Sequence, residues 1–403
     1  MEKYMDKEAR TYGGLPLAIT LTTSIQGLAT VMMLALATLA PIVSSALNVG
    51  VETVGYQISV IYIAAAFVSS ISGTLVHRFG GGATSQASLL VGAIGCIGLA
   101  SGNLIIVSLA SLLIGVAYGM TNPAASQLLN RVTPENRRGI VFSVKQSGVP
   151  LGGAVAGLSL PALTVLLGWQ GAILCIAGIA LIVAVCMVPI RKHLDYDRDV
   201  SVKISGNLTN GPAMVWNLPR LRALSLMGFC FSAVQLSLMS FMVILLVEDA
   251  LWGIIAAGVV ASFVQILGAI ARVSWGMLAD RTGCGMPVLA IIGTITCCAC
   301  IGVSGLTPGW PDWLIILTLS IFGVAAIGWN GVFIAEVVRS APHGKVGEAT
   351  GGALTFTFAG VVLGPSLYAA VHSFFPSYST TFLALMVLPA VGVALLLKEM
   401  TRD

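Results

Sequence analysis

Long apolar runs separated by short polar turns make up most of the chain. Roughly 20 consecutive apolar residues suffice to cross the hydrocarbon core of a bilayer as a helix, and the runs reach this length repeatedly. The pattern therefore predicts an all-α membrane protein with twelve transmembrane helices. Their predicted bounds are 15–44, 54–76, 84–101, 104–130, 140–166, 169–190, 222–247, 252–279, 286–306, 312–338, 348–372 and 379–398.

One long polar stretch interrupts this pattern between the sixth and the seventh predicted helix. Residues 191–221 are rich in Asp, Asn, Gly and Pro, which favour turns over membrane-spanning segments. We therefore predict an N-terminal six-helix bundle over 1–190, a linker over 191–221 and a C-terminal six-helix bundle over 222–403.

Composition and charge agree with a membrane protein. Hydrophobic residues make up 57% of the chain, charged residues 9%, and the mean hydropathy is +0.96. All but two of the 20 Lys and Arg fall on one side of the twelve-helix arrangement, whereas the opposite loops carry only the acids Glu52, Glu248, Asp249 and Asp312. The positive-inside rule therefore predicts that both termini and the linker are cytoplasmic. We expect a multi-pass protein of a bacterial inner membrane.

The residues that carry chemistry do not gather into a catalytic or metal site. The eight Cys lie nearly all within apolar runs and lack the pairing of zinc ligands. His372 is isolated near an outer helix end, and no nucleophile–base pair appears within the predicted spans. We therefore expect neither an enzyme, nor a cofactor, nor a bound metal. The net charge of +4, divided between the two membrane faces, does not indicate a nucleic-acid partner.

A short polar motif occurs twice, about half a chain apart, each time at the end of an apolar run. The two copies, which both read G-x-x-x-[D/H]-R-x-G, are Gly73-Thr74-Leu75-Val76-His77-Arg78-Phe79-Gly80 and Gly276-Met277-Leu278-Ala279-Asp280-Arg281-Thr282-Gly283. A second pair of similar segments is 131–139 and 339–347, and a glycine-rich helix follows each of them. Two parallel six-helix repeats with a binding site between them are typical of transporters.

These motifs and the twelve-helix layout resemble the major facilitator superfamily over essentially the full length of the chain. The resemblance implies a secondary active transporter that works by alternating access of its two halves. It also implies conformational roles for ten residues of the repeated segments, which are Gly73, Arg78, Gly148, Pro150, Gly276, Asp280, Arg281, Gly283, Glu336 and Arg339.

The first copy of the hairpin departs from the superfamily pattern. His77 replaces the acidic residue, and Gly81 and Gly82 replace the usual basic residues. We therefore expect a weaker conformational latch in the first half. Because histidine titrates near neutrality, this latch could respond to pH.

The two remaining cations, Lys145 and Arg272, fall within predicted spans. They lie roughly 10 to 12 Å along their helices from the cytoplasmic ends. Ionisable residues inside a span indicate a functional site, although each side chain could instead extend to the interface and pair there. Since the resembled fold brings these two helices to one cleft, the pair predicts a site for an organic anion. Arginine suits two-point recognition of a carboxylate.

Arg272 also lies four residues before Gly276, a spacing that resembles the substrate-binding arginine of monocarboxylate and oxalate–formate type carriers. The sequence departs from the monocarboxylate carriers at Gly268, where they have an aspartate. The first predicted helix, 15–44, also lacks the lysine that those carriers have in their first helix. The missing aspartate puts proton coupling of their type in doubt, although a coupling proton stays a candidate partner beside the small-molecule substrate and the lipid bilayer. We expect a monomer.

An exporter of drugs or hydrophobic metabolites, of the proton-antiporter type, is the alternative. The segment 148–153 reads G-x-P-x-G-G and is similar to the glycine–proline motif of those antiporters. Against this alternative, Glu336 is the only acid within a predicted span, and its spacing to Arg339 favours an ordinary helix pair. No carboxylate is expected at mid-membrane, where exporters of cations usually have one.

Several polar side chains are placed to complete a substrate site in either case. Any of them is also able to hold helices together by hydrogen bonds. We expect Gln26, Tyr118, Gln265 and Asn330 to contact and orient the anion beside Lys145 and Arg272. Gln26 and Asn330 fall mid-span on helices that line the cleft in the resembled fold, and Gln265 lies two turns above Arg272 on the same helix face.

Overall fold

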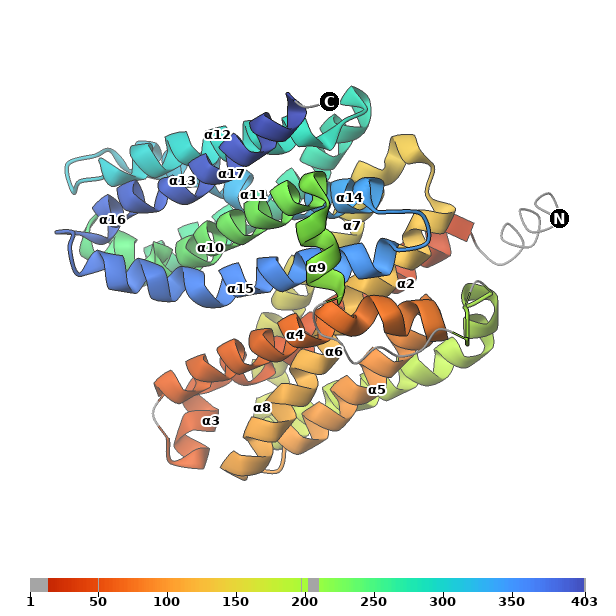
Figure 1. Ribbon diagram of the computed structural model, residues 1–403. Coiled ribbons are helices and arrows are strands. Elements are labelled where there is room, and N and C mark those ends of the chain that lie inside the picture. Colours follow the sequence, from red (N-terminus) through yellow and green to blue (C-terminus); the bar gives the residue numbers. More distant parts are fainter. Residues whose placement is uncertain (1–13, 50, 197, 202–209, 402–403) are drawn as a thin grey trace. The chain divides into compact units, whose positions relative to one another are not determined.

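The computed structural model describes residues 14–49, 51–196, 198–201 and 210–401, and this part of the chain is helical without a β-strand (Figure 1). The fold prediction is confirmed. From the N-terminus to the interhelical linker the helices are α2 (Gly14–Thr38), α3 (Ala40–Leu47), α4 (Val51–Phe79), α5 (Gly81–Leu99), α6 (Leu104–Val132), the 3₁₀ turn η1 (Glu135–Arg137), α7 (Arg138–Gln146), α8 (Gly148–Leu194) and α9 (Asn210–Asn217). The helices that follow are α10 (Pro219–Glu248), α11 (Ile254–Thr282), α12 (Gly285–Ser304), α13 (Asp312–Ala326), α14 (Asn330–Ser340), α15 (Val346–His372), α16 (Tyr378–Leu385) and α17 (Val387–Met400).

Eleven segments of the described chain are long and apolar enough to cross a membrane. One of them, Glu135–Arg191, has 57 residues, and a continuous helix of that length would measure about 85 Å, far more than one bilayer. Gly168 interrupts it with φ 71° and ψ 167°, a conformation that ends one helix and starts another. The segment therefore holds two crossings, and the protein is a multi-pass integral membrane protein.

Four predicted helices are interrupted in the structure. Proline accounts for two of the interruptions, because its ring removes a backbone donor: α8 begins two residues before Pro150, and α17 begins two residues before Pro389. A third break, at Leu39, precedes a helix that has proline in its first turn. The fourth, over 327–329 between α13 and α14, contains no proline.

Parts of the segment predicted as a linker are helical. Helix α8 continues to Leu194, and α9 forms over Asn210–Asn217 inside the expected linker. Residues 202–209 of the linker lie outside the described part of the chain. The predicted bundle boundaries stay a prediction.

Contacts divide the chain into two compact units. The first unit comprises the described residues of Met1–Pro134, Val144–Met214 and Ala341–Thr355, and the second comprises those of Glu135–Ser143, Val215–Ser340 and Phe356–Asp403. The start of α7 and the start of α15 therefore each pack with helices that are distant in sequence.

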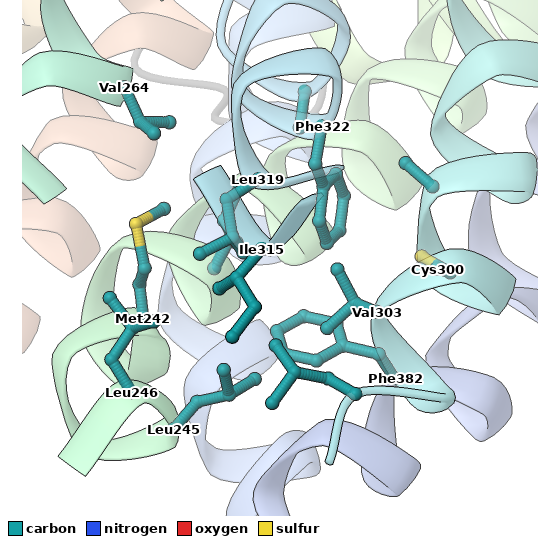
Figure 2. Packing of buried hydrophobic residues seen from close by; sticks show 14 of the residues in the cluster. Met242, Leu245, Leu246, Val264, Cys300, Val303, Ile315, Leu319, Phe322 and Phe382 are labelled. Atoms are coloured by element: carbon teal, nitrogen blue, oxygen red, sulfur yellow. The ribbon is translucent and has the colours of Figure 1, made fainter. Parts of the chain in front are cut away.

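The core of the second unit is a cluster of aliphatic and aromatic side chains from α10 to α16 (Figure 2). Met242, Leu245 and Leu246 of α10 pack with Ile315, Leu319 and Phe322 of α13 and with Phe382 of α16. The rings of Phe322 and Phe382 meet edge to face with centroids 5.4 Å apart. Because lipid is as apolar as these side chains, van der Waals packing rather than burial from water holds such helices together.

Candidate functional site

A buried ammonium group is the centre of the polar site in the first unit. Lys145 is 1% exposed, and its Nζ donates to Gln26 Oε1 at 2.7 Å, to Gln146 Oε1 at 3.1 Å and to Asn122 Oδ1. These contacts join α2, α6 and the end of α7. An ammonium has three N–H donors and no acceptor, so three amide oxygens satisfy it completely. We call Lys145, Gln26, Asn122 and Gln146 the lysine–amide cluster.

The local sequence explains why the lysine lies at a helix end. Pro150 cannot donate to the carbonyl of Gln146, and α7 stops at this residue before α8 begins at Gly148. The last carbonyls of a helix carry partial negative charge, which favours a cation such as Lys145 in the last turn. By ending α7 at Gln146, Pro150 places the ammonium of Lys145 close to the free carbonyls of a helix end.

Asn122 is positioned by a similar device in α6. The next residue, Pro123, lies inside the helix and leaves the carbonyl of Gly119 without its usual helical donor. The hydroxyl of Ser69 in α4 donates to that carbonyl at 2.9 Å. This bond connects α4 to α6 one turn from the lysine–amide cluster.

The charge of the cluster has no acidic partner among the described residues. Its three acceptors are neutral amides, and Gln26, which is 0% exposed, has no hydrogen-bond partner for its Nε2 within the described chain. Tyr118 lies one helical turn from Asn122, is buried, and meets the ring of Tyr62 edge to face at 5.9 Å. The structure thus brings together Lys145 and Gln26, with Tyr118 nearby on α6.

The glycine–proline segment packs α8 directly against α2. A Cβ added at Gly148 would lie 2.6 Å from the carbonyl oxygen of Thr23, and one at Gly152 would overlap that of Gly27. The glycines therefore permit backbone contact beside the cluster, as small residues do in membrane helices.

Arg272 of α11, in the second unit, is 3% exposed and bonds to a broken helix. Its Nε donates at 2.9 Å to the carbonyl of Ile327, the residue that follows α13. Trp275, one turn further along α11, donates from Nε1 to the carbonyl of Val324 at 3.0 Å. Both carbonyls belong to the end of α13, so these two side chains hold the helix break at 327–329.

Two further predicted site residues of the second unit are Asn330, which is partly buried, and Gln265, which is exposed. Asn330 begins α14, and its Nδ2 donates to Gln235 Oε1 at 3.1 Å; Trp329 donates to the same oxygen at 3.0 Å. Gln265 is exposed two turns before Arg272 on α11. The structure therefore joins Asn330 to Gln235, whereas Gln265 takes no part in the hydrogen bond between Arg272 and Ile327.

The second-half hairpin binds the start of α7. Asp280 accepts from the backbone N–H of Gly139 at 2.7 Å and of Ile140 at 2.8 Å. Gly276 allows this approach, since a Cβ there would crowd Ser143 and Gly139. Gly283 ends α11 with φ 71°, a conformation that favours glycine. Arg281 is exposed on this unit, and its predicted conformational role stays a prediction.

The first-half hairpin has a different neighbour. Gly73 lies against the start of α15, because a Cβ there would overlap the backbone of Glu348. His77, Thr74 and Lys345 help to line a cavity of about 190 Å³ beside this contact. His77 stands at the motif position that Asp280 has in the second copy. Arg78 places its guanidinium 5.7 Å from the ring of Phe79.

The carboxylate of Asp195, in the predicted linker, caps the start of α5, the helix that follows this hairpin. Asp195 accepts from the N–H of Gly82 at 2.7 Å and of Ala83 at 2.8 Å, at the start of α5. Gly80, with φ 94°, leaves room for this carboxylate. Burial raises the pKa of Asp195, while the two N–H groups and the charges of Arg131 and Arg191 oppose that rise.

Glu336 has the corresponding role in the second unit. It is fully buried, accepts from the N–H of Gly285 at the start of α12 at 2.9 Å, and pairs with Arg339 and with Arg220. The predicted pair of Glu336 and Arg339 is present, and the carboxylate also caps a neighbouring helix.

The sequence pattern did not predict the contacts that Asp195 and Trp275 make. Trp275 stands three residues after Arg272, a spacing that places both on one helix face and could have revealed their joint role. No comparable signal precedes Asp195, because the linker acid and the start of α5 are far apart in sequence. Within the described residues, no group of three His, Cys, Asp or Glu is arranged to hold a metal ion.

Comparisons with known proteins agree with this fold. A family model described as Major Facilitator Superfamily matches residues 20–365. An uncharacterised MFS-type transporter of Mycobacterium tuberculosis is 25% identical over 285 residues, which cover 70% of this chain and 62% of that protein. A hexuronate transporter of Bacillus subtilis is 28% identical over 155 residues, 38% of this chain and 36% of that protein. The match thus spans only 62% of the length of the mycobacterial relative.

Solved structures are similar over nearly the whole chain. The fucose:proton symporter of E. coli has a TM-score of 0.75 at 14% identity, and the alignment covers 96% of this chain and 99% of that chain. A human organic anion transporter has a TM-score of 0.76 at 14% identity, with 95% and 99% covered. At this level of identity the two likenesses show the fold alone.

Proposed function

We propose, from the premise that the chain belongs to the Major Facilitator Superfamily, that it carries a small organic anion by secondary active transport. The family and the relatives are transporters, and the chain is a transporter rather than an enzyme. The proposed substrate class is a carboxylate, moved by alternating access. Both termini are proposed to be cytoplasmic and the membrane to be a bacterial inner membrane, because nearly all Lys and Arg fall on one side of the helices.

The lysine–amide cluster carries this proposal. Taking an ammonium out of water costs several kcal/mol unless a counter-charge or hydrogen bonds compensate. Lys145 donates hydrogen bonds to neutral amide oxygens but has no acidic partner among the described residues, and Nε2 of Gln26 has no acceptor there either. An anionic oxygen would supply both the counter-charge and the missing acceptor.

Arg272 is the second proposed anion contact, on its own unit. Its guanidinium is planar and suits two-point recognition of a carboxylate, and its Nε donates to the carbonyl of Ile327. Gln265, Asn330 and Tyr118 are proposed to orient the substrate. The likeness to a hexuronate transporter over 155 residues gives modest support, since a hexuronate is a carboxylate.

A drug or metabolite exporter stays the second candidate. The contact of Gly148 and Gly152 with α2 favours it, because those residues form the segment that is similar to the motif of drug–proton antiporters. An exporter of hydrophobic compounds does not need the charge of Lys145. The two candidates therefore differ in how they depend on that side chain.

Uptake into proteoliposomes tests the proposal with a panel of carboxylates and hydrophobic cations. A charge-assisted hydrogen bond contributes about 1.5–3 kcal/mol, so Lys145→Gln is expected to lower carboxylate uptake about 10- to 100-fold. Arg272→Ala is expected to lower it as well. Lys345→Gln, which removes a lysine with a 58% exposed side chain, is the matched control. Carboxylate uptake that is the same in Lys145→Gln as in the control would refute the anion site, and transport of hydrophobic cations by both would favour the exporter.

A further inference from the structure

We infer that the lysine–amide cluster selects carboxylates that carry a hydroxyl group close to the carboxylate over unsubstituted carboxylates of the same chain length. This inference rests on the proposed transport of organic anions. It concerns the donors and acceptors that the cluster must satisfy before and after an anion binds.

Before binding, every donor of the ammonium is in use. Nζ of Lys145 has three N–H groups, and three amide oxygens accept them, from Gln26, Asn122 and Gln146. A carboxylate oxygen that bonds to Nζ must therefore replace at least one of these amide oxygens. The anion does not enter an empty coordination position.

The replaced oxygen would be left in a place that water does not reach. Gln26 is 0%, Asn122 5% and Gln146 4% exposed. A buried acceptor without a partner is costly, and a carboxylate cannot satisfy it because an ionised carboxylate only accepts hydrogen bonds. Binding of an unsubstituted carboxylate thus forms a hydrogen bond with the ammonium but breaks the hydrogen bond between the ammonium and one amide oxygen.

A neighbouring hydroxyl removes this loss. Its O–H donates to the released amide oxygen, while the carboxylate accepts from Nζ of Lys145. The second carboxylate oxygen accepts from Nε2 of Gln26, the donor that has no partner within the described chain. The hydroxylated anion therefore matches every group of the cluster, with one donor and two acceptors in a small space.

Binding measured on the purified, full-length protein tests the inference with matched probes. These are 2-hydroxybutyrate against butyrate and gluconate against hexanoate, titrated by thermal stabilisation and by inhibition of uptake. We expect each hydroxylated member to bind about tenfold more tightly, because one unsatisfied buried acceptor corresponds to about that factor.

Two variants remove an acceptor without adding a charge. Asn122→Leu and Gln146→Met each leave an N–H of Lys145 open, so a plain carboxylate no longer has to replace that oxygen. The tenfold preference is expected to fall to about twofold in at least one of them. Should one variant fail to fold, the other still gives the answer. Gln57→Leu is the control, since Gln57 is a buried amide of α4 that lines a separate cavity, and it is expected to keep the preference.

The outcomes separate this inference from the proposed function. Equal affinity for the two members of each pair in the wild-type protein overturns the inference and leaves anion transport intact. A preference that both acceptor variants keep unchanged overturns it too, because the amide oxygens are then not its cause. If no carboxylate binds or is transported, the proposed function falls and the inference falls with it.

Discussion

Gly152 provides a sharp test of the packing beside the cluster, through the substitution Gly152→Ala. A Cβ at this position would overlap the carbonyl oxygen of Gly27, and it would lie 2.9 Å from Thr30 Cβ and 3.0 Å from the carbonyl carbon of Gly27. Two of these three atoms belong to the backbone of α2, so no rotation of a side chain relieves the overlap. The helices α2 and α8 must move apart by a large fraction of an ångström.

The expected cost follows from that overlap. Inserting one methyl group into a tightly packed interior destabilises a protein by about 1–3 kcal/mol. The same helix offers a matched control in Gly157, where an added Cβ meets nothing within 4 Å. At an open helical position, alanine is favoured over glycine by about 0.8–1.0 kcal/mol.

The two substitutions should therefore have different effects on Tm relative to wild type. Thermal unfolding in detergent is expected to give a lower Tm for Gly152→Ala than for wild type, and an unchanged or higher Tm for Gly157→Ala. Equal Tm values for the two variants would refute the backbone contact between α2 and α8. A lower Tm for Gly157→Ala alone would contradict the assignment of the open face.

Two further predictions concern the bonds at helix ends. Asp195→Ala removes the acceptor of two backbone donors at the start of α5, and it is expected to destabilise the protein by about 0.5–2 kcal/mol in thermal unfolding. Asp199→Ala is the control, because that carboxylate is exposed and bonds to Ser201, two residues further along the chain, so its loss should lower Tm less. Equal losses of Tm in the two variants would contradict the capping role of Asp195. Trp275→Phe keeps the aromatic bulk but loses the donor to Val324, so Tm should fall by the equivalent of about 1 kcal/mol, and faster hydrogen exchange over 324–329 is the readout that a general loss of packing would not localise.

The pattern of the sequence predicts a large part of this fold because lipid imposes a simple rule on helix length. The positions of Lys145 and Arg272 inside spans also follow from the sequence, since few residues of their type fall there. What the sequence does not reveal are the partners of those charges. Asn122 accepts a hydrogen bond from Lys145 only because the fold brings the two residues together, and no periodicity within either helix encodes that contact.

The hairpins show the same limit. The motif identifies Gly276, Asp280 and Gly283 as a group, yet the structure gives each a separate physical role in packing, hydrogen bonding and backbone conformation. The first copy keeps its glycines, and the carboxylate at the start of α5 comes from Asp195 in the linker. Asp195 caps α5 as Glu336 caps α12, and neither contact is indicated by the motif itself, because both acids lie far from it in sequence.

The two intramembrane cations differ in what they would give up to bind an anion. Nζ of Lys145 donates to side-chain amides, which are able to rotate away when a substrate oxygen takes their place. Nε of Arg272 donates to the backbone carbonyl of Ile327 at a helix break, and that oxygen cannot leave unless α13 or α14 changes its path. If Arg272 contacts substrate, it must do so through its other donors or through a change of the broken helix. Lys145 can exchange partners without moving any backbone, and for that reason its charge is the first one to remove when the anion site is tested.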